Sequence, residues 1–572
     1  MNKILTLTAL LMLTLTAGAA VRVTLDDSRR CTLSNDLLTL QIDPKGRVTS
    51  CIYDNTELIA KPNTWYMSYN SDKYHELGAV EAVVKTRTED MVEVVYTNDA
   101  PGGARFSQGY ILRQGVSGVY TYVVIEGTDR PEGIGEARIV YRLDDALFHD
   151  GYVNDQAQGE MPRHEVMKAV ERSGMIQDAT FYLPDSTIYT KYDWATFMKD
   201  DHVHGVMSDH IGVWAMGCSM EYVNGGATRQ DLTVHSDIKS TLLLQMFISG
   251  HYGAFCPHFK AGMQKIYGPV MLYLNSGNRE QMIADAKQEA ARQEQAWPFS
   301  WFNHPLYPHD RATVSGRVRI TGNMPTSRLR VTLAQPGDIY KQTEDYIFFA
   351  ETDKKGNFSI PKVRKGTYTL HAYALEGENT DELEVHDIEV NASAVNLGTI
   401  DWTPVKHGKT LWRIGEADRL SAGFFLSDAP RAYDNFLRSP DTLHFTIGKS
   451  LESRDWFFCQ RPKSSYHIHF ALSKIQGDSC YLTLASAAAT LMPVIRIQVN
   501  GQQVAEFSNW DNDRDGSLYR SSTQAGHWQM HTVAFPASAL RKGQNTLTIN
   551  YPKGRRHGLG GILWDCIKLE IE

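Results

Sequence analysis

The runs Met91-Val92-Glu93-Val94-Val95-Tyr96 and Tyr120-Thr121-Tyr122-Val123-Val124-Ile125 decide the fold predicted for this chain. Both are rich in β-branched and aromatic residues, which pack well on a pleated sheet and indicate strands. Similar short runs, punctuated by Gly, Asn and Asp, recur from Val21 to about Leu274. This part of the chain is therefore predicted to be one large β-sandwich.

The length of the chain requires more than one domain. It has 572 residues, whereas a single hydrophobic core stops growing beyond roughly 250 to 300 residues. We expect an all-β protein in which residues 21–305 form a catalytic sandwich domain, residues 306–402 a second domain and residues 403–572 a third.

A helix is predicted at the end of the first domain. Asn278 and Gln281 have the spacing of a helix N-cap and its capping-box partner, and Pro298 stops the helix. The apolar residues that recur on one face are Met282, Ile283, Ala286 and Ala290. Trp297 to His309 then carries three prolines between aromatic residues and is predicted to be a stiff connector.

The remaining two domains are also predicted from strand and turn patterns. The stretches Asp353 to Ile360 and Lys365 to Leu370 are interpreted as hairpins of a small fibronectin-III-like sandwich. The third block, entered at Leu411-Trp412-Arg413-Ile414-Gly415 and closed by the strand Ile562 to Ile571, is interpreted as a jelly roll. Many jelly rolls bind sugars, so a carbohydrate-binding role and a purely structural role both stay open for it.

The N-terminus has the pattern of a secretory signal peptide in residues 1–20. Lys3 precedes an apolar run from Ile4 to Leu15, and Ala17-Gly18-Ala19-Ala20 supplies small residues for cleavage. The run is shorter than the roughly 20 residues that a membrane-spanning helix needs. We therefore expect a secreted protein, periplasmic or extracellular, without a membrane span.

Seven cysteines are too few, and odd in number, to form a disulfide framework in a chain of this length. Cys31 with Cys51, or Cys218 with Cys256, are the pairings considered for an oxidising compartment.

The charge balance argues against nucleic acid as a partner. Lys and Arg number 58 and Asp and Glu number 66, for a net charge of −8, which is mild for this size. A polyanionic substrate would need a local cationic groove.

Lys191 is the first candidate for catalysis. In the strand-like segment Thr187 to Trp194, alternation places Thr187, Tyr189, Lys191 and Asp193 on one face. A lysine has an ordinary pKa near 10.4 and must lose roughly 2 to 3 pKa units to serve as a base near neutrality. The alternative is a solvated surface lysine.

Arg138 is the candidate for binding a carboxylate. In the run from Glu136 to Leu143, alternate residues face a core, and Glu136, Arg138 and Arg142 share the opposite side. A guanidinium binds a carboxylate through two parallel hydrogen bonds. An ion pair between Arg138 and Glu136 on a solvated face is the alternative, and Arg142 is held in reserve.

His251 is the candidate general acid. It follows the mostly apolar run Leu242 to Ile248, which predicts a buried strand, so the imidazole lies where a rigid element passes into a loop. Histidine titrates near neutrality and can donate a proton without extreme tuning.

In their shared order these segments resemble polysaccharide lyase family 4, the rhamnogalacturonan endolyases. The resemblance rests on the Lys191 segment, Ser249-Gly250-His251 and further segments, which are Met161-Pro162-Arg163, Asn224-Gly225-Gly226, Gln230-Asp231-Leu232, Tyr267-Gly268-Pro269-Val270, Tyr273-Leu274-Asn275 and Leu411 to Gly415. It implies a galactose-mutarotase-like β-super-sandwich, a fibronectin-III-like sandwich and a carbohydrate-binding-module-like jelly roll.

The same resemblance implies an activity and a role for each residue. It implies β-elimination at the rhamnosyl-(1→4)-galacturonate bond of rhamnogalacturonan I, with Lys191 as base, His251 as acid and Arg138 binding the substrate. No catalytic metal is required, and the protein is expected to be a monomer. Some family members have tyrosines on the strand before the histidine, where this chain has Leu244 and Met246.

The sequence leaves two other functions open and contains two stretches that could suggest a metal site. The protein is alternatively a lyase on another uronate polysaccharide, or a non-catalytic glycan-binding protein. The stretch Asp511 to Gly516 resembles the opening of a calcium loop, but Ser522 stands at the twelfth position in place of Glu, so only a structural calcium stays open. The spacings of four histidines match no ligand motif, and these are His202, His204, His210 and His235.

Overall fold

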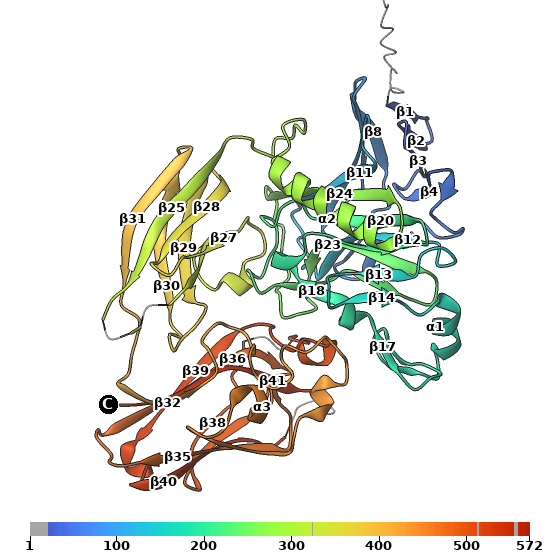
Figure 1. Cartoon of the computed structure of the whole chain (residues 1–572). Coiled ribbons are helices and arrows are strands. Elements are labelled where there is room, and N and C mark those ends of the chain that lie inside the picture. The colour runs from blue at the N-terminus through green and yellow to red at the C-terminus, as the bar shows by residue number, and fades with distance from the viewer. Residues whose placement is uncertain (1–20, 323, 326, 512–513, 554–558) are drawn as a thin grey trace, which may run out of the picture.

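Three β-rich modules follow one another along the chain in the computed structural model (Figure 1). It describes residues 21–322, 324–325, 327–511, 514–553 and 559–572. The all-β prediction is confirmed. The predicted signal peptide lies outside the described residues, and within them no helix has the length and apolarity to cross a bilayer.

The first module consists mainly of two large sheets. One sheet has ten strands, which run in the order β1 (Arg22–Leu25), β2 (Cys31–Ser34), β3 (Leu38–Ile42), β4 (Val48–Tyr53), β6 (Trp65–Asn70), β12 (Glu136–Leu143), β23 (Thr241–Ser249) and β22 (Val234–Ser236), with β5 (Thr56–Glu57) beside β4 and β7 (Tyr74–Glu76) beside β6. The other has nine strands, in the order β14 (Gln158–Glu160), β13 (Asp150–Tyr152), β19 (His204–Met207), β20 (Ile211–Met216), β24 (Gln264–Ser276), β11 (Gly118–Gly127), β10 (Ala104–Arg113), β9 (Met91–Thr97) and β8 (Glu81–Arg87).

Strand β9 shows why the strand sequences of this module, such as Met91 to Tyr96, are apolar almost throughout. Val92, Val94 and Tyr96 belong to the main core of the module, while Val95 packs on a second cluster that includes residues of the helix α2 (Arg279–Ala296). A strand covered on both faces has few positions left for polar side chains.

The predicted helix is present as α2, which lies across the first module (Figure 1). Asn278 accepts a hydrogen bond from the Gln281 amide at 3.0 Å, and Gln281 accepts one from the Asn278 amide at 3.1 Å. This reciprocal capping box confirms the predicted start. The predicted apolar face is also confirmed, because Met282, Ala286 and Ala290 are buried.

A group of short elements lies between the large strands of the first module. They are α1 (His164–Val170), β15 (Met175–Gln177), β16 (Thr180–Tyr182), β17 (Ile188–Thr190), the 3-10 turn η1 (Lys191–Trp194), β18 (Ala195–Phe197), η2 (Met198–Asp200) and β21 (Gln230–Leu232). The prediction of one strand from Thr187 to Trp194 is wrong beyond Thr190. The Thr190 hydroxyl accepts the amide of Tyr192 at 3.3 Å, which starts η1 and breaks the alternation before Lys191.

The second module is a sandwich of two small sheets. One has the order β28 (Asn357–Arg364), β25 (Arg311–Ile320) and β31 (Ala394–Trp402), and the other β27 (Phe348–Glu351), β26 (Leu329–Ala334), β29 (Gly366–Ala374) and β30 (Glu382–Val390), with η3 (Ile339–Lys341) before β27. The two predicted hairpins are wrong in their pairing. Both turns lead from one sheet to the other, because β28 pairs with β25, whereas β27 and β29 pair with β26.

The third module is a sandwich of two five-stranded sheets, as expected for a jelly roll. The first contains β32 (Lys409–Ile414), β41 (Gly561–Ile571), β36 (Ser479–Thr490) and β39 (Gln529–Pro536), with β34 (Cys459–Gln460) beside β41. The second has the order β33 (Thr442–Thr446), β35 (Ser464–Leu472), β40 (Gly543–Tyr551), β37 (Ile495–Val499) and β38 (Gln502–Phe507). Its short helical elements are α3 (Glu452–Asp455), η4 (Asn435–Arg438), η5 (Leu518–Arg520) and η6 (Ala537–Ala539).

Two minor sequence expectations concern cysteines and calcium. All seven cysteines have free thiols, so neither considered disulfide forms. In the calcium-like stretch, Asn512 and Asp513 lie outside the described residues, and the Asp515 carboxylate accepts the amides of Ser517 and His527 at 2.9 and 3.2 Å.

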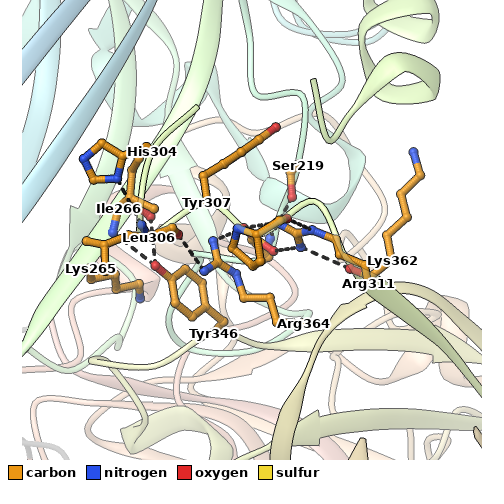
Figure 2. A network of polar contacts seen from close by, with 12 residues as sticks. Ser219, Lys265, Ile266, His304, Leu306, Tyr307, Arg311, Tyr346, Lys362 and Arg364 are labelled. Carbon is orange, nitrogen blue, oxygen red and sulfur yellow. Dashed lines mark hydrogen bonds and ion pairs between the residues drawn. The ribbon is translucent and has the colours of Figure 1, made fainter. Parts of the chain in front are cut away.

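The first two modules are joined by a polar seam, part of which is shown in Figure 2. The buried carboxylate of Glu221 pairs with Arg311 and Arg364 of the second module. Burial alone would raise the pKa of Glu221, but the two guanidinium groups hold it below its ordinary value. Arg364 also lies 3.5 Å from the ring centre of Tyr346, whose hydroxyl accepts the Ile266 amide at 3.1 Å.

We expect Glu221→Ala to destabilise this seam strongly. Removing one partner leaves two buried guanidinium groups without their counter-charge, which costs about 3 to 5 kcal/mol. Urea unfolding followed by tryptophan fluorescence measures the loss. In the matched control Asp401→Ala, which breaks the exposed ion pair with Arg319, the midpoint should stay where it is. Equal midpoints for the two variants would contradict a stabilising seam.

Candidate active site

Arg138 and His251 come from neighbouring strands of the ten-stranded sheet. Arg138 lies on β12, and His251 follows two residues after the last residue of β23, Ser249. The strands pair in antiparallel fashion with Glu136 opposite Ser249. This register brings the end of β12 that carries Arg138 next to the turn that carries His251.

The carboxylate of Glu136 lies between these two side chains. Its Oε1 is 3.2 Å from Nη2 of Arg138, and its Oε2 is 3.7 Å from Nδ1 of His251. Burial raises the pKa of Glu136, and the charges of Arg138 and Lys191 act in the opposite direction. Arg138 and Glu136 therefore form an ion pair, but Glu136 is buried, so the pair does not lie on the solvated face of the alternative and belongs to the same cluster as His251 and Lys191.

Lys191 reaches this cluster from the first position of η1. Only 11% of its side chain is exposed, and its Nζ lies 3.2 Å from Asp178 and 5.2 Å from the ring centre of Tyr192. Burial lowers the pKa of Lys191, and Arg138 lowers it further, whereas Asp178 raises it. The environment favours the neutral amine that a base requires.

His251 lies near the same tyrosine. The ring centres of His251 and Tyr192 are 6.1 Å apart, so one aromatic ring contacts both Lys191 and His251. Nδ1 of His251 contacts the Ser249 hydroxyl at 2.7 Å. Burial lowers the pKa of His251 well below its ordinary value, and the charges of Lys191, Arg520 and Arg138 lower it further.

Arg138 retains unused hydrogen-bonding capacity. Its Nη2 pairs with Glu136, while its buried Nε has no hydrogen-bond partner among the described residues. A buried N–H without a partner is costly in isolation. A guanidinium with an unpaired N–H is suited to donate hydrogen bonds to an anion.

The third module contributes an arginine that the sequence did not reveal. Arg520, at the end of η5, donates a hydrogen bond from Nη1 to the carbonyl oxygen of His251 at 2.8 Å, and its guanidinium lies 5.5 Å from the ring centre of Tyr192. The two bonded residues are 269 positions apart in the chain. No local pattern predicts a contact at that separation.

A cleft between the first and third modules lies beside η1. It has a volume of about 440 Å³, and its lining includes Asp193, Trp194, Phe197 and Arg431. Lys191, His251 and Arg138 are not in its lining. Burial raises the pKa of Asp193 to about 7, although Ser521 and Arg431 act against this shift.

The reserve arginine and the four histidines without a ligand motif have other surroundings, although burial lowers the pKa of His235 and the charges of Lys191 and Arg138 reach it and lower that pKa further. Arg142, held in reserve, donates from Nη1 to Asp237 and Ser240 at 2.8 and 3.1 Å. His204 is buried between Asp201 and the Leu244 carbonyl, and the other three histidines considered are the exposed His202 and His210 and the buried His235.

Comparison with known proteins places this arrangement in a family. Residues 24–288 match the family model for the N-terminal domain of rhamnogalacturonan lyase B, and residues 311–396 and 410–569 match those for domains II and III of polysaccharide lyase family 4. A rhamnogalacturonate lyase from Dickeya dadantii is 33% identical, with 98% of this chain and 97% of that protein covered. A probable rhamnogalacturonate lyase B from Aspergillus flavus is 25% identical, with 97% of each covered.

These matches define the protein as an enzyme of the lyase class. The chain belongs to polysaccharide lyase family 4, which confirms the resemblance found in the sequence. The fold predicted from that resemblance is confirmed as well.

We expect Asp178→Asn to lower the pKa of Lys191 further. The change removes the negative charge that stabilises the ammonium, while the amide keeps an acceptor for the Tyr192 hydroxyl, which bonds Asp178 at 2.8 Å. Carbon-13 NMR of ε-labelled lysines, assigned with Lys191→Arg, measures the shift.

The matched control for this titration is Asp185→Asn. Asp185 lies at the surface and bonds Thr187, so its replacement should leave the pKa of Lys191 unchanged. A pKa that rises in Asp178→Asn would show that Asp178 does not stabilise the charged form of Lys191.

Proposed function

We propose that this protein is an endo-acting rhamnogalacturonan lyase that cleaves the rhamnosyl-(1→4)-galacturonate bond of rhamnogalacturonan I by β-elimination. In this proposal Lys191 is the base, His251 is the acid and Arg138 binds the substrate carboxylate. The observation that carries the proposal is that Lys191 and His251 are both buried beside the ring of Tyr192. Arg138 joins the same cluster through its ion pair with Glu136.

The reaction needs three actions on one galacturonate unit. The neutral amine of Lys191 takes the C5 proton, and the electrons of the C5–H bond form the C4=C5 double bond. The C4–O4 bond breaks, and His251 donates a proton to the departing O4. Arg138 pairs with the carboxylate at C5 and stabilises the negative charge that develops there.

Substrate binding changes the proton affinity of His251 in the direction that an acid requires. In the protein alone, cationic neighbours help to keep His251 deprotonated. A substrate carboxylate paired with Arg138 offsets that positive charge, which raises the pKa of His251. The histidine then becomes able to carry the proton that it donates.

The cleft beside η1 supports an extended substrate path. Trp194 and Phe197 provide apolar surface, and Arg431 and Asp193 provide polar groups, which together suit the faces and hydroxyls of sugar rings. We assign neighbouring sugars of the polymer to this cleft, so cleavage occurs within chains.

We further propose that the enzyme is exported, acts as a single chain and needs no metal for elimination. The N-terminal pattern supports export to the periplasm or the medium, and the enzyme acts as a monomer. Elimination needs no metal in this scheme, because the cationic Arg138 neutralises the carboxylate. A calcium ion bound near Asp511 would support the fold and take no part in catalysis.

We expect Lys191→Ala and His251→Ala each to abolish elimination. Loss of a general acid or base lowers the rate by roughly 10² to 10⁴-fold. Rhamnogalacturonan I is incubated with each variant, and the ultraviolet band of the unsaturated uronide is followed over time. The exposed Lys239→Ala and His210→Ala, in the same module, are the matched controls and should react at the rate of the unchanged protein.

The same assay separates the alternatives. Binding of the polysaccharide without new absorbance would identify a glycan-binding protein, and absorbance only with a different uronate polymer would identify another substrate. New reducing ends without the ultraviolet band would indicate hydrolysis.

We also expect elimination to continue when divalent ions are chelated. At a temperature well below unfolding, EDTA should leave the initial rate unchanged, because the guanidinium of Arg138 takes the position of a cation at the carboxylate. In Arg138→Gln the rate should fall, and added Ca²⁺ should not restore it. A rate that EDTA abolishes and Ca²⁺ restores would overturn the role given to Arg138.

A further inference from the structure

Two neighbouring strands of the second module bring an imidazole and two carboxylates together. His371 on β29 is directly opposite Glu384 on β30, and Glu382 lies on the same face of β30 two residues before it. One ligand atom from each of the three residues lies within 4.8 Å of the other two. The pattern Glu382-Leu383-Glu384-Val385-His386 produces this face by simple strand alternation.

The tautomer of His371 is determined by its surroundings. Its Nε2 lies 2.8 Å from the carbonyl oxygen of Gln335, which only accepts, so Nε2 carries a proton. In the neutral imidazole, Nδ1 would direct its lone pair at the carboxylates of Glu382 and Glu384, at 3.0 and 3.7 Å. A lone pair facing two carboxylates requires a positive charge between them.

We propose that His371, Glu382 and Glu384 bind a divalent transition-metal ion of the Zn²⁺ type at the boundary between the second and third modules. Ligand atoms about 2.0 to 2.2 Å from zinc in a tetrahedral site are roughly 3.3 to 3.5 Å apart. The two distances from Nδ1 of His371, 3.0 and 3.7 Å, bracket that value.

Each ligand is also held by a second group. The Gln335 carbonyl orients His371, Arg419 pairs with Oε2 of Glu382, and Nε2 of His386 lies 3.7 Å from Oε2 of Glu384. Bonds of this kind hold metal ligands in a fixed orientation, and the Gln335 carbonyl also makes His371 more basic.

The three ligands lie where a metal ion can reach them and can affect the contact between two modules. His371 is fully buried, but Glu382 and Glu384 line a cavity of about 520 Å³ between the second and third modules. Arg419, at the entrance of the third module, stacks on Tyr373 of β29 at 3.8 Å and on Trp528 at 4.3 Å. A metal held by Glu382 therefore acts on the contact between the modules.

A proton on Nδ1 of His371 competes with a metal ion for the space between the imidazole and the two carboxylates. Burial opposes protonation, but the hydrogen bonds with Glu382 and the Gln335 carbonyl raise the pKa of His371. A doubly protonated His371 would satisfy both carboxylates without a metal. The experiment must distinguish an imidazolium from a metal ligand.

The test uses the full chain without a polyhistidine tag, stripped with a chelator and titrated with Zn²⁺ or Co²⁺. We expect one equivalent to bind, to raise the unfolding temperature, and with Co²⁺ to give the intense visible bands of a four-coordinate ion. His371→Gln should remove these effects, and the partly exposed Glu384→Gln, which keeps the fold, should weaken binding at least about tenfold. Ca²⁺ should not compete, because the imidazole ligand disfavours a hard cation.

The exposed His444 and the half-buried His467 and His469 on the third module provide a matched control, since their rings stack on one another. A variant with all three changed to Gln should still bind one equivalent. Binding lost in that variant but kept in His371→Gln would overturn the proposal. So would nitrogen-15 NMR showing protons on both ring nitrogens of His371 in the presence of Zn²⁺. No readout depends on lyase activity, so the result is independent of the proposed function.

Discussion

The candidate site depends on the crowding of cationic groups in a buried region. Lys191, Arg138 and Arg520 all act on His251, and burial strengthens every one of these interactions. The carboxylate of Glu136 offsets part of the charge and lies beside both Arg138 and His251. The proton affinities of the lysine and the histidine are therefore set together, and a change at any one of these residues alters the others.

Much of this arrangement could be predicted because it follows from strand periodicity. Alternation on β12 correctly separates Ala137 and Ile139, which enter the core, from Arg138, which faces the site. The position of His251 follows from the apolar run that precedes it, since such a run ends where a strand leaves the sheet. The capping box at Asn278 is equally local, and the structure reproduces it.

Other features could not be predicted because side chains or distant segments decide them. One hydroxyl, that of Thr190, turns the backbone and places Lys191 on a 3-10 turn in place of a strand. The turn after Glu351 has a hairpin sequence, yet the sandwich uses it to change sheets. Arg520 reaches His251 only because the third module folds against the first, and His371 meets Glu382 only through the register of β29 and β30.

The position of β41 has a consequence for the order in which the protein matures. This strand, Gly561–Ile571, lies inside its sheet between β32 and β36, although it follows every other strand of that sheet in the chain. The sheet cannot close before those residues leave the ribosome, and such distant pairings form slowly. Arg520 belongs to the same module, so we expect His251 to gain this neighbour only after β41 has been synthesised. In the nascent chain, His251 therefore lies in a first module that still lacks its contact with Arg520.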